Sequence, residues 1–367
     1  MLRRSILFKT HQDQGAQFVE YSGWEVPARF VPVDQEYDAI RTSAGLVDLS
    51  SSGVIEAIGP DRAQFLHRML TNDVKALVPG QGCYATFLTP QGRTLADMTV
   101  YCLEDSLFLT VEAGLSEKVT AGLRKFSIGN RVELLDRSAD LSLLSIQGVK
   151  SGDFLSQVTP KLSPCLEPFS HSATQIGTAH VRICCVNRTP FTGYDLLVPH
   201  EDLEQTWNLF VERGRPWGLR PVGWEALNVH RVEAGIPLYG VDVDETQIPL
   251  EAGLDSAISL KKGCYIGQEI IARATYLGHL NRRLGGLVLA GQQLAAKDAK
   301  IFKEQKEVGW ITSSVYSLGL KRCIALGYLR REVWEPGTNL AIDSPSGRIQ
   351  CEVTTLPFVL SSVPASK

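Results

Sequence analysis

Asp97 is the first residue whose type and position could do chemistry. It lies in a run at residues 95–103 where apolar and polar side chains alternate as in a β-strand, and it shares a face with Tyr101. A carboxylate held beside aromatic rings can exchange a proton or hold a cationic amine, because partial burial tunes its pKa. Alternation also fits an exposed acid on the polar face of a half-buried strand, and by itself it favours that simpler interpretation.

A second candidate is the sequence Lys-Gly-Cys-Tyr-Ile-Gly-Gln-Glu at residues 262–269. Its two glycines allow a tight turn, and Lys262, together with a following helix N-terminus, would favour the thiolate of Cys264. The alternative is a turn in which Cys264 and Tyr265 only pack inward. Local chemistry does not separate these two interpretations.

Two further groups of reactive side chains have structural explanations. Arg231 and Glu233 lie near the end of a predicted helix. They could serve a ligand, but an ion pair at a domain junction explains them as well. Cys184 and Cys185 are expected to be ordinary strand residues, one facing inward and the other outward.

Composition excludes several classes of protein. The 367 residues suffice for two or three domains, and the net charge of −3 gives no basic footprint for nucleic acid. No apolar run approaches the roughly 18 residues that cross a bilayer, so we expect no membrane span. The eight cysteines are scattered without a C-x-x-C pair, and the seven histidines do not cluster with them. We therefore expect no metal site and a reducing, cytoplasmic location.

The elements that must position these residues form an α+β mixture. Helices are predicted at residues 60–70, 115–126, 202–213 and 224–234, with Gly214 ending the third. Strands are predicted at residues 84–88, 95–103, 106–111, 141–146, 180–186 and 194–198. Beyond residue 282, short apolar runs alternate with turn residues, which is typical of a small β-barrel or jelly roll.

An ordered series of short motifs resembles the aminomethyltransferases, the T-proteins of the glycine-cleavage system. The series includes Tyr-Ser-Gly-Trp-Glu-Val-Pro at residues 21–27, Gly-Leu-Val-Asp-Leu-Ser at 45–50 and Leu-Thr-Asn-Asp-Val at 70–74. Residues 92–100, 231–240, 246–254, 327–328 and 336–338 continue it. The resemblance thus runs from about residue 7 to about residue 358, which is nearly the whole chain.

This resemblance implies a three-domain cloverleaf of the T-protein type around a central folate site. Its parts would be ferredoxin-like or antiparallel sheet domains and a C-terminal β-barrel of the jelly-roll type. We expect residues 1–52 plus 140–225 to form one folate-binding domain half, residues 53–139 plus 226–281 a second α+β domain, and residues 282–367 the barrel. The implied ligand is tetrahydrofolate.

The resemblance also assigns residues to the folate site. The catalytic aspartate of the family falls on Asp97, which would contact folate as well. Tyr84 and Tyr101 match positions that pack on the folate. Asp195 falls where the family uses a glutamate to accept hydrogen bonds from the pterin, whose edge offers paired N–H donors.

Two positions depart from the T-protein pattern. Leu227 stands where the family has an arginine that helps to hold folate, and Glu112 stands where the transferases often have asparagine. The chain therefore loses a positive charge and gains a negative one. We expect both changes to weaken binding of the anionic glutamyl tail.

The sequence predicts an aminomethyl transfer to tetrahydrofolate with Asp97 as the catalytic carboxylate. The folate N5 would attack an aminomethyl group on a lipoyl carrier protein, and ammonia would be released. Residues 262–269, however, resemble the signature of a YgfZ-type branch that binds folate and maintains iron–sulfur proteins through its cysteine, here Cys264. The alternative is therefore an accessory protein for iron–sulfur cluster assembly or repair.

Overall fold

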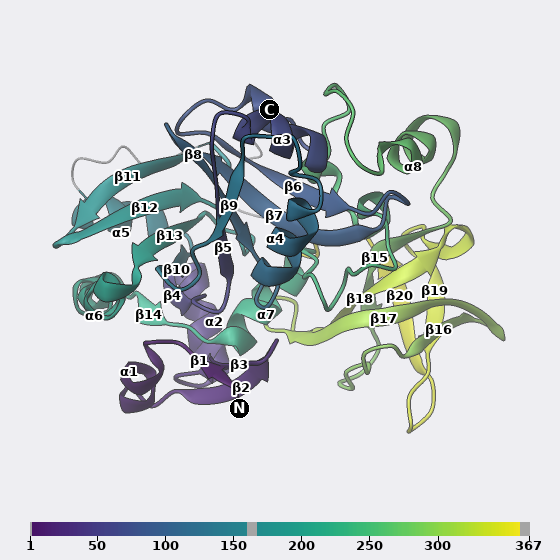
Figure 1. Ribbon diagram of the computed structural model, residues 1–367. Helices are drawn as coiled ribbons and strands as arrows, with labels where there is room; N and C mark the ends of the chain where they lie inside the picture. The colour runs from purple at the N-terminus through teal and green to yellow at the C-terminus, as the bar shows by residue number, and fades with distance from the viewer. Residues whose placement is uncertain (1, 160–166, 360–367) are drawn as a thin grey trace. The chain divides into compact units, whose positions relative to one another are not determined.

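The computed structural model describes residues 2–159 and 167–359 (Figure 1). These residues fall into two compact units. Unit 1 comprises Met1–Leu88, Leu95–Leu227 and Ser256–Ile266. Unit 2 comprises Thr89–Thr94, Asn228–Asp255 and Gly267–Lys367. Within the described ranges, no helix has both the length and the apolar character needed to cross a membrane.

The first sheet of unit 1 has five strands and two helices on one face. In spatial order the strands are β6 (Gly82–Leu88), β7 (Thr94–Cys102), β8 (Ser106–Val111), β5 (Gly53–Ile58) and β9 (Glu133–Asp136). The helices are α3 (Arg62–Met69) and α4 (Ser116–Arg124). Met98 and Val100 of β7 share a core with these helices. Asp97 and Tyr101 therefore point to the opposite face of the sheet, because successive strand residues alternate.

The second sheet of unit 1 has six strands. In spatial order they are β11 (His171–Ile176), β12 (Ala179–Cys185), β13 (Gly193–Pro199), β10 (Leu141–Gln147), β4 (Gly45–Asp48) and β14 (Arg220–Pro221). One face is covered by α5 (Ser151–Val158) and α6 (Leu203–Gly214), whose Phe154, Trp207 and Phe210 share a core with the sheet. The pairing of β10 with β13 sets Ser145 opposite Asp195.

The two sheets of unit 1 face each other through their remaining surfaces. Tyr101 of β7 lies in one apolar cluster with Leu143 of β10, Cys184 of β12 and Leu197 of β13. Asp97 shares the face of Tyr101, and Asp195 shares the face of Leu197. The two aspartates therefore belong to the inner faces of this two-sheet layer.

The prediction that one of the two adjacent cysteines faces outward is wrong. Cys185 is buried in the core under α5 and α6, and Cys184 is buried between the two sheets. Strand β12 is covered on both faces, which two residues of sequence cannot reveal.

The end of α6 also differs from the prediction, because Gly214 is the last residue of the helix and does not follow it. A short 3₁₀ helix (Arg215–Trp217) continues the chain to Gly218, whose φ of 82° makes the stop.

The N-terminal segment adds a small sheet and two helices to unit 1. Its strands are β1 (Arg3–Arg4), β3 (Trp24–Arg29) and β2 (Gln17–Tyr21), and its helices are α1 (Phe8–Asp13) and α2 (Val33–Thr42). The end of β2 carries Tyr21, whose hydroxyl donates to Glu112 Oε2 at 3.2 Å.

Unit 2 contains a closed barrel and the segments that join it. The barrel strands are β15 (Arg282–Leu289), β18 (Arg322–Arg330), β17 (Lys306–Ser317), β16 (Lys300–Lys303), β19 (Asn339–Ile342) and β20 (Ile349–Thr354). Helices α7 (Trp224–Glu233) and α8 (Gln268–Ala272) precede it in the chain. The α+β class and the C-terminal β-barrel are thus confirmed, whereas the division into three domains stays a prediction.

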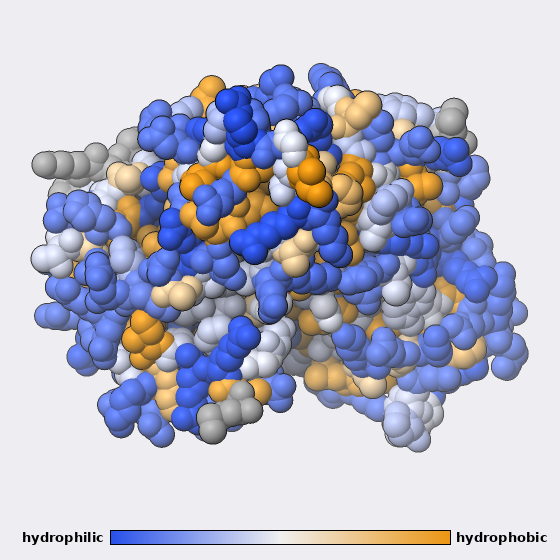
Figure 2. All heavy atoms as spheres, viewed as in Figure 1, coloured by the Kyte–Doolittle hydropathy of each residue, from blue (hydrophilic) through white to orange (hydrophobic). Residues whose placement is uncertain are grey.

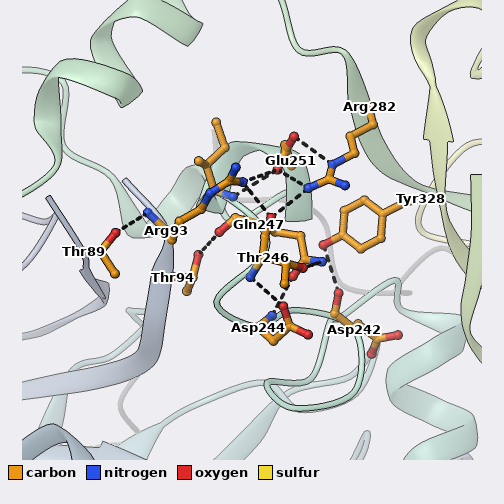
Figure 3. A network of polar contacts seen from close by, with 11 residues as sticks. Thr89, Arg93, Thr94, Asp242, Asp244, Thr246, Gln247, Glu251, Arg282 and Tyr328 are labelled. Atoms are coloured by element: carbon orange, nitrogen blue, oxygen red, sulfur yellow. Dashed lines mark hydrogen bonds and ion pairs between the residues drawn. The ribbon is translucent and has the colours of Figure 1, made fainter. Parts of the chain in front are cut away.

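A network of polar contacts fixes the loops of unit 2 to the barrel (Figure 3). Arg282 of β15 donates to Glu251 at 3.0 Å and to the carbonyl of Thr246 at 2.8 Å, and Arg93 donates to that same carbonyl at 2.6 Å. The hydroxyl of Tyr328 donates to the carbonyl of Asp242 at 2.9 Å.

Arg231 and Glu233 have structural partners in the same unit. Arg231 forms a buried ion pair with Asp242 and donates to Ser313 at 2.8 Å, while Glu233 accepts from Ser317. These contacts support the structural explanation of both charges.

Candidate functional site

Asp97 and Tyr84 meet across neighbouring strands of the five-stranded sheet. The hydroxyl of Tyr84 donates to Oδ2 of Asp97, and Oδ1 of Asp97 is buried with no hydrogen-bond partner among the described residues. Burial raises the pKa of Asp97 to about 6; the hydrogen bond from Tyr84 opposes this rise, and the charge of Glu112 adds to it. A carboxyl group with this pKa and an available oxygen is suited to proton exchange near neutral pH.

An aromatic side chain that the sequence did not single out accompanies Tyr84. The rings of Phe169 and Tyr84 lie nearly parallel, with centroids 6.3 Å apart. Phe169 precedes β11 and adopts a φ of 63°. No local pattern marks it, since it follows no regular alternation and its partner lies on another sheet.

Asp195 is enclosed by an arginine that the sequence analysis did not predict. Nε and Nη2 of Arg188 both donate to the Asp195 carboxylate, at distances from 2.8 to 3.1 Å. Ser145 adds a hydrogen bond to Oδ1 at 2.7 Å. The side chain of Asp195 is 1% exposed, against 24% for Arg188. Burial opposes the charge on Arg188, but Asp195 outweighs it and raises the pKa of the guanidinium.

Arg188 is held at its backbone as well as at its side chain. Its amide nitrogen donates to Oε1 of Gln147 at 2.9 Å, and Nε2 of Gln147 donates to Ser145 at 2.9 Å. Gln147 and Ser145 are neighbours on one face of β10, so the strand fixes both ends of this arrangement. The only sequence signal for Arg188 is its place between two predicted strands, where loops often carry functional side chains.

Glu112 lies directly after β8 and faces the same arginine. Its Oε1 is 3.9 Å from Nη1 of Arg188, and its Oε2 accepts from Tyr21. Glu112 is 24% exposed. The charge that the sequence analysis expected to oppose folate is therefore partly balanced by Arg188.

Tyr101 occupies the apolar layer between the sheets. It is 1% exposed and lies against Cys184, Leu143 and Leu197. Its ring meets that of His171 edge-on, with centroids 5.4 Å apart. Tyr101 therefore packs in the apolar layer between the two sheets in this structure. Its direct stacking on folate stays a prediction.

The Cys264 segment is anchored elsewhere in unit 1. Nζ of Lys262 donates to the carbonyls of His67, Leu70 and Asn72, at the end of α3. Although the sequence predicts this ammonium beside the Cys264 thiol, its three donors are directed to the carbonyls. Cys264 itself is exposed, whereas the other described cysteines are buried or partly buried.

The candidate residues thus form two groups. Tyr84, Asp97, Glu112, Arg188 and Asp195 are linked by contacts and charge effects on the inner side of the two sheets. Among the described residues, no hydrogen bond or ion pair connects Cys264 to this group. A separate hollow of about 570 Å³, lined by Gln17 and residues 29–34, contains none of the candidates.

Comparison with known proteins identifies the family. The model of the GCVT N-terminal domain matches residues 7–262, and that of the glycine cleavage T-protein C-terminal barrel domain matches residues 282–359. Curated aminomethyltransferases match over the full chain. That of Geobacillus thermodenitrificans is 33% identical over 98% of this chain and 98% of its own, and that of Bacillus subtilis is 30% identical over 98% and 99%.

The chain belongs to the aminomethyltransferase family. This confirms the resemblance stated from the motifs. The family carries out folate-dependent one-carbon transfer and uses tetrahydrofolate, so the predicted ligand is confirmed at that level. The crystal structure of the glycine cleavage system aminomethyltransferase T from Bartonella henselae matches with a TM-score of 0.90, covering 98% of this chain and 99% of that one. At 24% identity, that likeness supports the fold alone.

Proposed function

We propose that this chain transfers an aminomethyl group to tetrahydrofolate with Asp97 as the catalytic carboxylate. The observation that carries the proposal is the setting of Asp97: one oxygen held by Tyr84, the other buried without a partner, and a pKa raised to about 6. An orphaned carboxylate oxygen in a buried site is costly unless a ligand satisfies it. In this family the ligands that could satisfy this oxygen are folate and the donor of the one-carbon group.

In this reaction the folate supplies the nucleophilic N5, and the protein positions the reactants. Tyr84 orients the carboxylate of Asp97 by donating to Oδ2. Attack by N5 on the aminomethyl carbon breaks the bond of that carbon to the carrier sulfur, which leaves as the thiolate. Oδ1 of Asp97 accepts the proton that N5 loses and returns it to the amine, which leaves as ammonia when N10 of the folate bonds to the same carbon and passes its proton to the thiolate. The parallel rings of Tyr84 and Phe169 offer an apolar wall beside this carboxylate. A lipoyl carrier protein is the proposed donor.

Asp97→Asn tests the role of the carboxylate. The amide keeps the size of the side chain but cannot take a proton, so we expect kcat for ammonia release to fall at least 100-fold. Asp105→Asn is the matched control, because Asp105 is exposed in the turn between β7 and β8. Wild-type turnover in Asp97→Asn, measured with an aminomethylated lipoyl carrier, would remove Asp97 from the mechanism.

A second candidate function rests on the exposed thiol of Cys264. Cys264 is the exposed member of the described cysteines, and it is presented by a segment that Lys262 fixes to the end of α3. A thiol presented this way could serve a YgfZ-type accessory role in iron–sulfur cluster assembly or repair. The test is activity of iron–sulfur enzymes in cells lacking the protein, complemented with Cys264→Ala or Asp97→Asn. Loss with Cys264→Ala and rescue with Asp97→Asn would favour this role, and the reverse would favour the transferase.

A further inference from the structure

The Asp195 carboxylate is bound by protein donors at both oxygens. Ser145 donates to Oδ1, Nη2 of Arg188 donates to Oδ2, and the single N–H of Nε is shared between the two oxygens. If Asp195 bound a ligand instead, its charge-assisted hydrogen bonds with Arg188 would break. A carboxylate that is only 1% exposed would then lack its counter-charge. Asp195 therefore acts as the support of Arg188 and does not read the ligand itself.

Around Asp195, the side chains of Arg188 and Glu112 retain bonding capacity. Nη1 of Arg188 has no hydrogen-bond acceptor among the described residues, and its nearest carboxylate oxygen, Oε1 of Glu112, is 3.9 Å away. That separation is too long for a hydrogen bond. Both side chains are 24% exposed, so they lie at the accessible side of the cluster.

We infer that Arg188 and Glu112 together read a lactam edge of the ligand, that is, a ring carbonyl next to a ring N–H. Nη1 of Arg188 donates to the carbonyl oxygen, and Oε1 of Glu112 accepts from the N–H. The 4-oxo pterin ring of tetrahydrofolate carries this edge, so the inference rests on the proposed function and names the residues that select its ligand. With Arg188 as the donor and Glu112 as the acceptor, the lactam edge can bind in one orientation only.

The cluster is built to hold this pair in place before a ligand arrives. Arg188 is fixed by Asp195 through its side chain and by Gln147 through its backbone. Glu112 is fixed by the hydroxyl of Tyr21. Groups already held in position lose little freedom on binding, which favours affinity and selectivity.

Charge argues against an anionic group as the occupant. Glu112 and Asp195 carry two negative charges against the single positive charge of Arg188. A further carboxylate placed between Arg188 and Glu112 would meet Glu112 directly and be repelled. A neutral edge with one acceptor and one donor meets no such penalty.

The test is anaerobic calorimetry with tetrahydrofolate and its 4-amino-4-deoxy analogue, which replaces the carbonyl acceptor by a donor. We expect wild type to bind the 4-oxo form at least tenfold more tightly, because a buried donor left without its acceptor is costly. Glu112→Ala and Arg188→Lys should each weaken the 4-oxo form about tenfold and shrink the preference, since each loses one bond to the edge.

Whether Arg188→Gln strengthens or weakens tetrahydrofolate binding shows which side chain, Asp195 or Arg188, recognises the pterin. If Asp195 reads the ligand, Arg188→Gln frees it and tetrahydrofolate binds as well or better. If Arg188 reads the ligand, binding weakens. The double variant Arg188→Gln/Asp195→Asn avoids a buried uncompensated charge, and it should also bind weakly. Arg137→Gln and Glu56→Gln, which break a pair in unit 1 outside this cluster, are the matched controls.

Each outcome decides something. Unchanged or tighter binding in Arg188→Gln, or equal affinity of wild type for the two ligands, overturns the lactam inference and leaves the folate function standing. No binding of tetrahydrofolate to wild type at millimolar concentration overturns both. Thermal unfolding of every variant shows whether a loss of binding comes from a loss of fold.

Discussion

Asp97 and Asp195 are two carboxylates on the inner faces of neighbouring sheets, Asp97 partly buried and Asp195 fully buried, and their hydrogen-bond partners differ. Both oxygens of Asp195 accept hydrogen bonds, from Arg188 and from Ser145. Asp97 receives a single tyrosine hydroxyl and keeps Oδ1 available. This difference in the supply of hydrogen-bond donors supports the proposal that Asp97 is the reacting carboxylate and Asp195 the supporting one.

The raised pKa of Asp97 makes stability depend on pH. The pKa rises from an ordinary 3.8 to about 6, so between these values the folded chain holds a proton that the unfolded chain has released. Stability therefore falls as pH rises through this window, and the loss is complete above about pH 6. Asn cannot titrate, so its stability lacks this pH dependence. The free energy of unfolding of Asp97→Asn relative to wild type should therefore rise by about 2–3 kcal/mol from pH 4 to pH 7.5, as measured by urea unfolding.

The control for this experiment is Asp105→Asn. Asp105 is exposed, so its substitution should leave the difference from wild type nearly the same at both pH values. A pH-independent difference for Asp97→Asn would show that the buried carboxyl group titrates at its ordinary value.

At the scale of elements, one clamp fixes the segment that carries Cys264. Helix α3 ends at Met69, and the carbonyls around its end face Nζ of Lys262. The orphan carbonyls of a helix end need donors, and a cation suits the negative end of the helix dipole. A single lysine thus joins α3 to a segment almost 200 residues further along the chain.

Lys262→Met should lower the free energy of unfolding by about 2–4 kcal/mol, because three carbonyls lose a charged donor. Lys261→Met is the matched control, since Lys261 is exposed next to it and should change stability by less than about 0.5 kcal/mol. Urea unfolding at pH 7 measures both. Equal stability of the two variants would mean that water replaces the ammonium without loss.

Local patterns predicted the elements better than the contacts between them. Alternation in residues 95–103 predicted β7 and the shared face of Asp97 and Tyr101, because the period of a strand is a property of the backbone. The same reasoning could not predict Arg188, whose partners Asp195 and Glu112 come from a different strand and a different sheet. It also failed to predict that Cys184 and Cys185 are both buried, since the second sheet and helices α5 and α6 that cover them are tertiary.

At the scale of the whole molecule, the barrel strands complete the loops that precede them in unit 2. Asp242 is buried with Arg231, and it accepts from Thr312 and Ser313 of β17. Glu251 receives Arg282 of β15. A buried ion pair stripped of its remaining partners is strongly destabilising. The barrel is therefore part of the stability of residues 228–255.

A chain ending at residue 281 should consequently lose the order of residues 228–255. Hydrogen–deuterium exchange is the measurement, and we expect amides in this range to exchange at least 100-fold faster than in the full chain. Strand β8 of the five-stranded sheet is the internal reference, because it lies within unit 1. Full protection of residues 228–255 in the shortened chain would show that the barrel adds nothing to their stability.

The surface view adds that hydrophilic side chains cover most of the face shown, with apolar side chains gathered in places (Figure 2). The exposed large hydrophobic residues include Ile128, Val78 and Tyr276. Exposed apolar side chains are normal on protein surfaces.

The burial of most of the described thiols makes selective labelling of the exposed one feasible. Of the cysteines in the described ranges, Cys264 is exposed, and burial raises the pKa of both Cys83 and Cys351 to about 12. Alkylating reagents react with the accessible thiolate, so a maleimide dye should attach at Cys264 before it reaches any other cysteine of the described ranges. A fluorophore placed there would sit on the segment that Lys262 ties to α3, and it would report by polarisation whether that segment loosens when a carrier protein docks.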